Sequence, residues 1–330
     1  MHPAVTRYCR QVSNTVVHTR QPLILLQFIG MGLVWGASFM FMKGALAGLS
    51  FGQLAWSREI LGAVTLGVVM LVMRQRLPRS RVVWLHFVVI ALANAVIPHL
   101  LFAWAEQYVS SSLGSIYNSL TPIATAIMAT LVFHVEKLTG SQVWGVIVGV
   151  LGVLVIIGPW QYSALTGSLQ GQVACIVAAT SYGFAIGYMR KFISPTPLPG
   201  ITVGFMNVGM SATIMLILTP FLAIGPVKLN PWVVGSVLLL GCLGTGVAYF
   251  WSVNVLRAWG PTRQSTVTYV IPVVGVVLGV FVLGDRLSWN EPVGAAIVLL
   301  GILLTQGRLR RRRPTVADVP VSPDLGFVES

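Results

Sequence analysis

The sequence predicts an all-α membrane protein with ten transmembrane helices in two inverted five-helix repeats. Three observations predict this fold class. Only 9% of the 330 residues are charged, whereas soluble proteins carry about 25%. Apolar runs of spanning length recur along the whole chain, and the second half repeats the pattern of the first. Because so few charges could not cover a surface in water, lipid is the expected solvent for most of the chain.

The apolar runs have the length, about 20 residues, that an α-helix needs to cross the hydrocarbon core. In lipid the backbone must satisfy its own hydrogen bonds, so helices are expected. The runs also lack the alternation of transmembrane β-strands. The predicted helices cover residues 23–43, 51–73, 82–105, 112–133, 141–158, 170–189, 200–223, 231–253, 264–283 and 291–307.

The basic residues lie mainly on one side of this topology. With the N-terminus in the cytoplasm, most of the 21 lysine and arginine residues fall in cytoplasmic segments, including the run RLRRRR at 308–313. Cytoplasmic loops carry such an excess, and an odd number of helices would scramble it. We therefore expect a multi-pass protein of the inner (plasma) membrane with both termini in the cytoplasm.

The chain is expected to divide into five segments. They are a cytoplasmic basic tail (1–22), a first repeat (23–158), an external linker (159–169), a second repeat (170–307) and an Arg-rich, disordered cytoplasmic tail (308–330). The first apolar run is too long for a signal-peptide core, so it is interpreted as an uncleaved anchor. The arginine run of the last tail is interpreted as a topology anchor, with anionic membrane lipid as the alternative partner.

The net charge of +13 is not the signature of a nucleic-acid-binding protein here, because the basic residues occupy short gaps between apolar runs. The three cysteines are Cys9, Cys175 and Cys242, and they show neither a paired framework nor the spacing of metal ligands. No catalytic residue, metal or cofactor is therefore predicted.

An internal repeat relates the two halves. HVEKLTGSQVWGVIVGVLGVLVIIG (134–158) aligns with LGDRLSWNEPVGAAIVLLGILLTQG (283–307), and WGASFMFMK (35–43) aligns with YGFAIGYMR (182–190). Five helices per unit make the second copy enter the membrane from the opposite side. Inverted repeats with a site near the midplane between them are common in secondary transporters.

The aligned glycines point to close helix packing. Gly145 and Gly152 are seven residues apart and so share one helix face, as do their partners Gly294 and Gly301. Small residues on one face let helix backbones approach closely. We expect this packing within the monomer, with homodimerisation as the alternative.

The motifs of both halves resemble one family. WGASFMFMK, Arg58 and SLGSIYNSLTPIATAIMATLVFHVEKLT in the first half, with VTYVIPVVGVVLGVFVLGDRLSWNEPVGAAIVLLG in the second, are similar to the EamA type of the drug/metabolite transporter (DMT) superfamily. The resemblance covers residues 23–307 and implies ten helices in two inverted halves that export metabolites, amino acids or drugs. Two departures are Asp285, where the family commonly has Glu, and GFMNVG in the seventh helix, which has no counterpart of Arg58.

Two prolines mark a candidate site. Pro122 and Pro272 lie near the centres of the predicted fourth and ninth helices. Proline removes a donor and displaces the carbonyl four residues back, here those of Asn118 and Thr268. Freed backbone groups at this depth are tolerated where they line a cavity. We interpret both prolines as helix breaks beside a substrate site that uses Asn118, Thr121 and Thr268, and a kink that only shapes packing is the alternative.

Other deep polar and aromatic side chains are candidates for the same cavity. Polar groups inside the membrane are costly and usually face a cavity, and aromatic walls suit an amphipathic or aromatic solute. Ordinary core packing is the alternative for each, and His99 is also a candidate proton relay. The candidates are Trp35, Asn94, His99, Tyr117, Tyr182, Asn207, Tyr249 and Tyr269.

Three charges near the predicted outer bilayer edge are candidates for a gate or for coupling: Arg58, Glu59 and Glu106. Arg58 and Glu59 are adjacent, so they point about 100° apart on a helix, and an Arg58–Glu106 pair is one arrangement. No carboxylate pair is predicted deep in the membrane, so facilitated transport stays open beside proton coupling. Asp285 and Arg286 lie at a helix end and are expected to fix a turn.

These patterns favour a secondary transporter, an exporter of small metabolites, amino acids or drug-like solutes that works by alternating access between the inverted halves. The expected partners are a small-molecule solute, membrane lipid and, if transport is coupled, the proton; the protein is expected to be a monomer or homodimer. A lipid-linked substrate flippase of the same superfamily is the alternative. An intramembrane enzyme is disfavoured because the sequence contains no HExxH motif.

Overall fold

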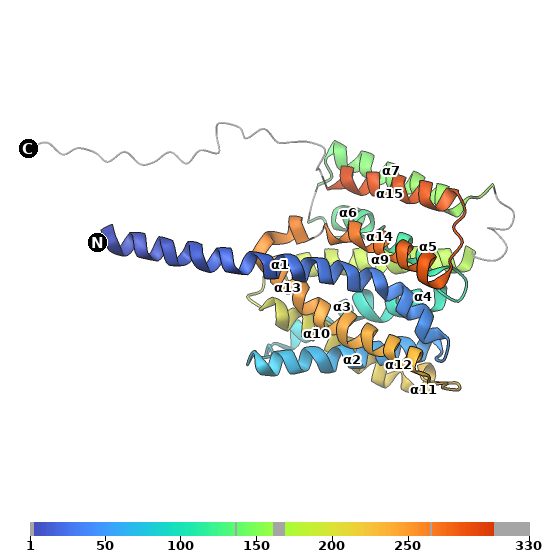
Figure 1. Ribbon diagram of the computed structural model, residues 1–330, viewed down its shortest axis with the longest axis horizontal. Coiled ribbons are helices and arrows are strands. Elements are labelled where there is room, and N and C mark those ends of the chain that lie inside the picture. Colours follow the sequence, from blue (N-terminus) through green and yellow to red (C-terminus); the bar gives the residue numbers. More distant parts are fainter. Residues whose placement is uncertain (1–2, 136, 161–168, 265, 307–330) are drawn as a thin grey trace, which may run out of the picture.

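The computed structural model describes residues 3–135, 137–160, 169–264 and 266–306, and within these the side chains from Gln21 onward except those of 260–263. The described residues form an elongated bundle of helices without β-strands (Figure 1). This confirms the predicted all-α fold class. The predicted external linker lies mostly outside the described residues, and the Arg-rich tail lies wholly outside them.

The first repeat contributes five spans. α1 (Pro3–Leu46) and α2 (Phe51–Val72) are followed by a third span made of α3 (Arg81–Ala91), the π-helix η1 (Leu92–Val96) and α4 (Ile97–Ala105). The fourth span is split into α5 (Ser111–Asn118) and α6 (Thr121–Leu131), and the fifth is α7 (Gly140–Ile157).

The second repeat contributes five more. They are α9 (Leu169–Phe192); α10 (Gly200–Ile217) with the short α11 (Thr219–Leu222); α12 (Pro231–Leu238), the π-helix η2 (Leu239–Val247) and α13 (Ala248–Gln264); α14 (Val267–Leu278) with the π-helix η3 (Gly279–Leu283); and α15 (Asn290–Thr305).

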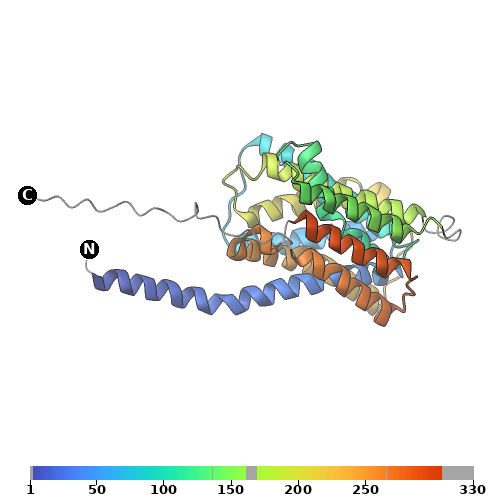
Figure 2. The ribbon, with the colours of Figure 1, turned by 90° about the horizontal axis from the view of Figure 1, so that it is seen from above.

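Seven helices among the described residues are long and apolar enough to cross a membrane. Two shorter apolar helices, Val267–Leu283 and Asn290–Thr305, and the split pair α5–α6 supply the remaining spans. The chain is therefore a multi-pass membrane protein. α15 ends at the end of the bundle from which α1 protrudes, as an even number of spans requires (Figure 2).

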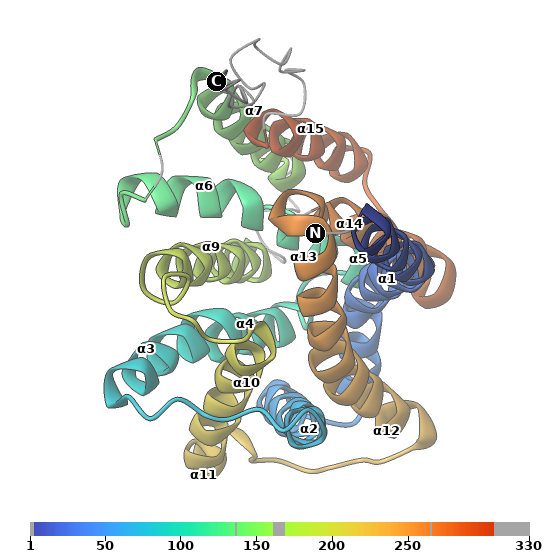
Figure 3. The ribbon, with the colours of Figure 1, turned by 90° about the vertical axis from the view of Figure 1, so that its left-hand side faces the viewer.

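The two repeats are inverted. α1 and its counterpart α9 run in opposite directions along the bundle (Figure 1). Their surroundings are exchanged in the same way, because α1 packs on α14 of the second repeat whereas α9 packs on α6 of the first. α2 packs on its own counterpart α10, and α7 on its own counterpart α15 (Figure 3). The halves therefore interlock across a pseudo-two-fold axis.

The α7–α15 contact is built on the aligned glycines. A Cβ at Gly145 would lie 2.7 Å from the Gly301 carbonyl oxygen, and a Cβ at Gly294 would lie 2.8 Å from the Gly152 carbonyl oxygen. Only glycine fits such a backbone approach. The predicted use of these glycines within the monomer is confirmed.

Several helix boundaries differ from the predicted ones. α1 begins at Pro3 rather than at residue 23, because the segment before the apolar run contains no glycine and the next proline is Pro22. α1 continues through Pro22 and protrudes from the bundle (Figure 2). The π-helices η1 and η2 were not predicted, because no hydrophobic period distinguishes five or nine residues of π-helix from α-helix.

The two prolines behave differently. α5 ends at Asn118 and α6 begins at Thr121, with Pro122 in the first turn of α6. Pro272, in contrast, lies inside an uninterrupted α14, so the predicted helix break at Pro272 is wrong. Pro272 is the sixth residue of α14, and the helix continues through it because a proline removes only its own N–H donor.

Candidate functional site

A central cavity of about 220 Å³ lies between the two halves. Seven spans contribute to its wall, four from the first repeat and three from the second. The lining residues are Trp35, Ser38, Phe39, Met42, Arg58, Asn94, His99, Phe102, Asn118, Thr121, Tyr182, Ile186, Gly244, Tyr249, Thr268 and Ile271.

The wall is arranged in repeat partners. Trp35 and Tyr182 are aligned in the two halves, as are Asn118 and Thr268, and both members of each pair line the cavity. The π-helices also occupy corresponding spans, and they bring Asn94 of η1 and Gly244 of η2 to the cavity. π-Helical turns are frequent at functional sites. The cavity therefore lies where the pseudo-symmetry relates the halves.

Hydrogen bonds hold part of the polar wall in place. The Trp35 Nε1–H group donates to the carbonyl of Gly244 at 3.0 Å. Asn94 Nδ2 donates to the Tyr249 hydroxyl at 2.8 Å. Both bonds connect the first repeat to the second, so they fix the width of the cavity between the halves.

The apolar wall is largely aromatic. The rings of Trp35 and Tyr249 meet edge to face with centroids 6.3 Å apart. Phe102 stacks on Tyr182 at 6.2 Å and meets Phe39 edge to face at 5.5 Å. Rings in such contact are held rigidly, and their faces suit a solute with an apolar or aromatic body.

The split fourth span brings polar groups to the cavity. Because α5 ends before Pro122, the carbonyl of Asn118 lacks a helical partner and accepts a hydrogen bond from the Thr121 hydroxyl at 2.8 Å. Asn118 and Thr121 both line the cavity. The break thus presents an amide and a hydroxyl at a depth where a continuous apolar helix would present neither.

Arg58 lines the cavity from α2. Its Nε–H group donates to the Thr245 hydroxyl at 3.0 Å, and one terminal nitrogen lies 3.9 Å from the Met42 sulfur. The expected position of Arg58 near the outer bilayer edge stays a prediction. Residue 58 lies two helical turns into α2, or about 11 Å along its axis.

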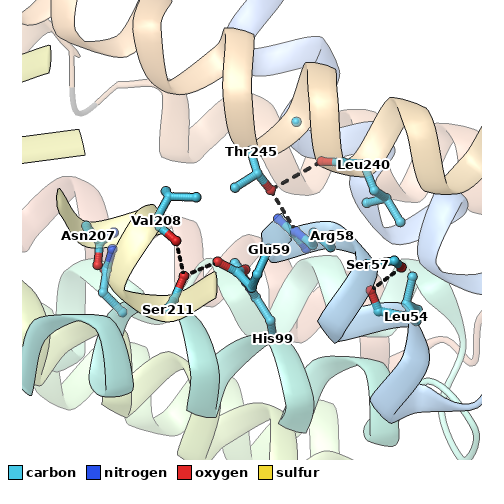
Figure 4. Close-up of polar contacts among 12 residues, drawn as sticks. Leu54, Ser57, Arg58, Glu59, His99, Asn207, Val208, Ser211, Leu240 and Thr245 are labelled. Carbon is cyan, nitrogen blue, oxygen red and sulfur yellow. Dashed lines mark hydrogen bonds and ion pairs between the residues drawn. The ribbon is translucent and has the colours of Figure 1, made fainter. Parts of the chain in front are cut away.

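Glu59 points about 100° away from Arg58 around α2 and forms a buried pair with His99 (Figure 4). One carboxylate oxygen contacts His99 Nδ1, and the other accepts a hydrogen bond from the Ser211 hydroxyl. Glu59 is fully buried and does not line the cavity, whereas His99 does. The sequence offered Glu59 and His99 only as separate candidates, because the pair is formed by helices distant in sequence.

Glu106 is separate from this pair. It is fully buried at the end of α4, and both its carboxylate oxygens lack a hydrogen-bond partner within the described chain. Lys43 donates to the backbone carbonyls of Glu106 and Val109. Arg58 contacts Thr245 instead of Glu106, so the Arg58–Glu106 ion pair is not formed.

Three predicted cavity residues do not line the cavity. Tyr117 is buried and donates its hydroxyl to Gln172 at 2.7 Å, and Tyr269 donates to Gln306 at 2.7 Å. Each is adjacent to a lining residue, and adjacent residues point about 100° apart on a helix, so only one of each pair faces the cavity. Asn207 lies behind Tyr249, to whose hydroxyl its amide donates at 3.2 Å.

Asp285 connects the repeats at the end of the bundle farthest from the N-terminus, called here the distal end. Its carboxylate accepts hydrogen bonds from the backbone N–H and the hydroxyl of Ser112 on α5. Beside it, α14 approaches α5 so closely that a Cβ at Gly275 would lie 2.4 Å from the Ser115 side chain. Asp285 thus does more than fix its own turn, since it joins the distal ends of α5 and η3.

Several residues that line the cavity were not predicted from the sequence. Ser38, Phe39 and Met42 line the cavity beside Trp35, and their spacing of three, four and seven residues from Trp35 marks a single helix face. That spacing was a signal that could have found them. Ser211 had no such signal, because its role depends on Glu59 of another repeat. The other lining residues that were missed are Phe102, Ile186, Gly244 and Ile271.

The described part of the chain contains no group of three or more His, Cys, Asp or Glu side chains that could hold a metal ion. Cys175 and Cys242 are free thiols, and Cys9 lies among residues whose side chains are not described.

Comparison with known proteins agrees with the two-repeat fold. The EamA-like transporter family matches residues 22–158 and again residues 169–306. A solved crystal structure matches with a TM-score of 0.59 and 17% sequence identity over 87% of this chain and 98% of that chain. At this identity the match supports the fold alone.

The curated relatives are transporters by name. The uncharacterized transporter YoaV of Bacillus subtilis is 24% identical over 88% of this chain and 99% of its own. An uncharacterized transporter of Archaeoglobus fulgidus is 28% identical over 82% of this chain and 94% of its own. A probable terminal-alkyne amino-acid exporter of Streptantibioticus cattleyicolor is 24% identical over 85% and 92%.

The family match covers nearly the whole chain, once for each of the two inverted halves that enclose the cavity. This chain belongs to the EamA-like transporter family.

Proposed function

We propose that this transporter exports small amphipathic solutes of amino-acid size by alternating access between its inverted halves. The observation that carries the proposal is the cavity itself, which lies between the repeats and is lined by repeat partners such as Trp35 and Tyr182. Such a position is the usual place of the substrate site in inverted-repeat transporters.

The size and lining of the cavity support a small solute. Its volume of about 220 Å³ is below the roughly 300–1,000 Å³ typical of pockets for drug-sized ligands. Aromatic rings form much of its wall, with amides and hydroxyls between them. A small solute with one polar end and one apolar end matches this lining better than a lipid-linked saccharide does.

The distal end supports alternating access. There α5 and α14 are held together by the Ser112–Asp285 hydrogen bonds and by the close approach at Gly275. Opening these contacts while the opposite end closes would exchange access between the two sides of the membrane. Because the repeats are inverted, the outward-open and inward-open states can be related by exchange of the conformations of the two halves.

The direction of transport and its energy source belong to the same proposal. The amino-acid exporter among the relatives supports export of amino-acid-sized solutes. The Glu59–His99 pair borders the cavity through His99. Acidic and histidine side chains inside a membrane commonly form proton relays. We assign the coupling proton to this pair, with facilitated transport as the alternative.

Flux measurements test the proposal. Purified protein in liposomes should exchange radiolabelled amino acids or aromatic metabolites in a counterflow assay. Trp35→Ala, which removes a cavity wall, should reduce the rate several-fold. Trp144→Ala is the matched control, because Trp144 is 64% exposed on α7 outside the cavity and should change little. Absence of flux for every solute of a broad panel, with correctly folded protein, would contradict the transport proposal.

A further inference from the structure

We propose that Arg58 is the anchor for a solute carboxylate, so that the transported solutes are small organic anions or zwitterions with an apolar body. This inference rests on the proposed function and specifies the substrate class of its cavity. Arg58 is the one Lys, Arg, Asp or Glu side chain among the residues that line the cavity.

The guanidinium is positioned but incompletely bonded. An arginine carries five N–H donors in a planar fork. The described residues engage its Nε–H with Thr245 and place one terminal nitrogen near the Met42 sulfur, which is a weak acceptor. No carboxylate of the described chain lies within 4.0 Å of Arg58, since the one ion pair at that distance joins His99 and Glu59. Terminal N–H groups are thus left for a ligand.

The neighbouring acid does not neutralise this site directly. Glu59 points about 100° away from Arg58 around α2, is fully buried, and engages both oxygens with His99 and Ser211 (Figure 4). A solute in the cavity can therefore contact Arg58, whereas Glu59 does not line the cavity. The pair of parallel N–H groups on a guanidinium matches the two oxygens of a carboxylate.

Thr245 gives the fork its orientation. Its hydroxyl accepts from Arg58 and donates to the carbonyl of Leu240 at 3.2 Å, five residues earlier in the π-helix η2. The Arg58 side chain of the first repeat is therefore oriented by the π-helix η2 of the second repeat. Because this hydrogen bond already orders the Arg58 side chain, ligand binding would cost little additional side-chain entropy.

The Arg58 charge also makes the two halves of the cavity wall chemically different. The position aligned with Arg58 in the second repeat is Asn207, which is buried behind Tyr249 and does not line the cavity. The lining residues of the second repeat thus include no Lys, Arg, Asp or Glu side chain. A bound solute would place its carboxylate at Arg58 and its apolar body against the rings of Phe39, Phe102 and Tyr182.

Matched probes test this assignment. Binding to the purified transporter is measured by titration calorimetry and by thermal shift with phenylalanine and 3-phenylpropionate, and with 3-phenylpropanol and 3-phenylpropylamine, which lack the carboxylate. Wild type should bind the carboxylates at least roughly tenfold more tightly than the alcohol, since charge-assisted bonds are about twice as strong as neutral ones. Arg58→Gln should abolish this preference for the carboxylates over the alcohol.

Two further variants separate binding from folding. Arg58→Lys keeps the charge but loses the fork, and should retain a reduced carboxylate preference even if Arg58→Gln folds poorly. Arg257→Gln is the matched control, because Arg257 is exposed on α13 outside the cavity, and it should behave as wild type.

The outcomes also separate this inference from the proposed function. A wild type that binds no carboxylate probe, or prefers the alcohol or amine, would overturn the carboxylate assignment, as would a preference that survives Arg58→Gln. Flux of a neutral solute in the same liposomes would then still support transport. Absence of all flux would instead contradict the proposed function.

Discussion

The carboxylate of Asp285 accepts hydrogen bonds from the backbone N–H and the hydroxyl of Ser112, at 2.9 and 2.8 Å. An acid of the second repeat thus caps the first turn of α5 in the first repeat. The contact joins the two spans that contain α5 and α14, which approach each other closely at Gly275 and Ser115.

Asp285→Ala is expected to loosen the distal end. It leaves the Ser112 N–H without its acceptor, and loss of a helix-capping acceptor costs about 1 kcal/mol. The melting temperature should fall, and a cysteine introduced at Ser115 in a cysteine-free background should react faster with a maleimide. Glu291→Gln is the acidic control, since the Glu291 carboxylate accepts a hydrogen bond from the nearby Ser288 N–H at 3.2 Å within its own repeat. An unchanged labelling rate in Asp285→Ala would contradict closure by this contact.

Glu59→Gln is expected to remove the response of transport to a pH gradient. Glutamine keeps hydrogen-bonding capacity toward His99 and Ser211 but cannot carry the proton that the pair would exchange. The other polar groups packed around the pair are Arg58, Tyr182 and Tyr249. Wild-type counterflow and net flux should change with an imposed pH gradient, and the variant should retain counterflow but lose that change.

His99→Ala tests the other partner of the pair. Removal of one member of a buried ion pair leaves an uncompensated charge and costs about 3–5 kcal/mol, so this variant should also be less stable than Glu59→Gln. A pH dependence of flux equal to that of wild type would remove His99 from the coupling route. If both variants keep the wild-type dependence, the coupling proton does not use this pair; a wild-type net flux that does not respond to a pH gradient would instead identify a facilitator.

Gly301→Val is expected to separate α15 from α7. A Cβ at Gly301 would lie 2.6 Å from the Gly149 backbone nitrogen and 2.7 Å from the Gly145 carbonyl oxygen. Overpacking of this kind costs about 1–3 kcal/mol, which thermal unfolding in detergent would detect as a lower melting temperature. Gly140→Ala is the control, because nothing lies within 4 Å of the added Cβ. A tolerated Gly301→Val would show that the two helices separate freely.

Tyr249→Phe is expected to destabilise the cavity wall. The Tyr249 hydroxyl accepts hydrogen bonds from both Asn94 and Asn207, so its removal leaves two amide donors without that partner. An unsatisfied buried polar group costs about 1–3 kcal/mol. Tyr108→Phe, at a 39% exposed residue, is the matched control for thermal unfolding. Equal melting temperatures of the two variants would mean that water replaces the lost hydroxyl at the wall.

Sequence predicts the spans and the inverted repeat well, because both depend on local composition and on spacing within the chain. Trp35, Tyr182, Asn118 and Thr268 were also identifiable as cavity candidates, since each stands at aligned positions of the two halves. The orientation of Tyr117 was not, because Tyr117 and Asn118 are adjacent on α5 and only the packing of that helix decides which of them faces the cavity.

The buried Glu59–His99 pair illustrates what the sequence does not reveal. Its members belong to two spans of the first repeat, and its third partner, Ser211, belongs to the second. Ser211 has no pattern of its own that marks a polar contact. The position of Arg58 at the cavity was likewise not predicted, because hydropathy locates the edges of a span and not the helix face that borders a cavity.

Cysteine labelling in intact cells tests the inverted arrangement most directly. Ser80 precedes α3 in the first repeat and Lys228 precedes α12, its counterpart in the second, and both residues are exposed. In a cysteine-free background, a membrane-impermeant maleimide should label Lys228→Cys from outside and Ser80→Cys only after the cells are permeabilised. Labelling of both positions from the same side would contradict two inverted halves and the shared cavity between them.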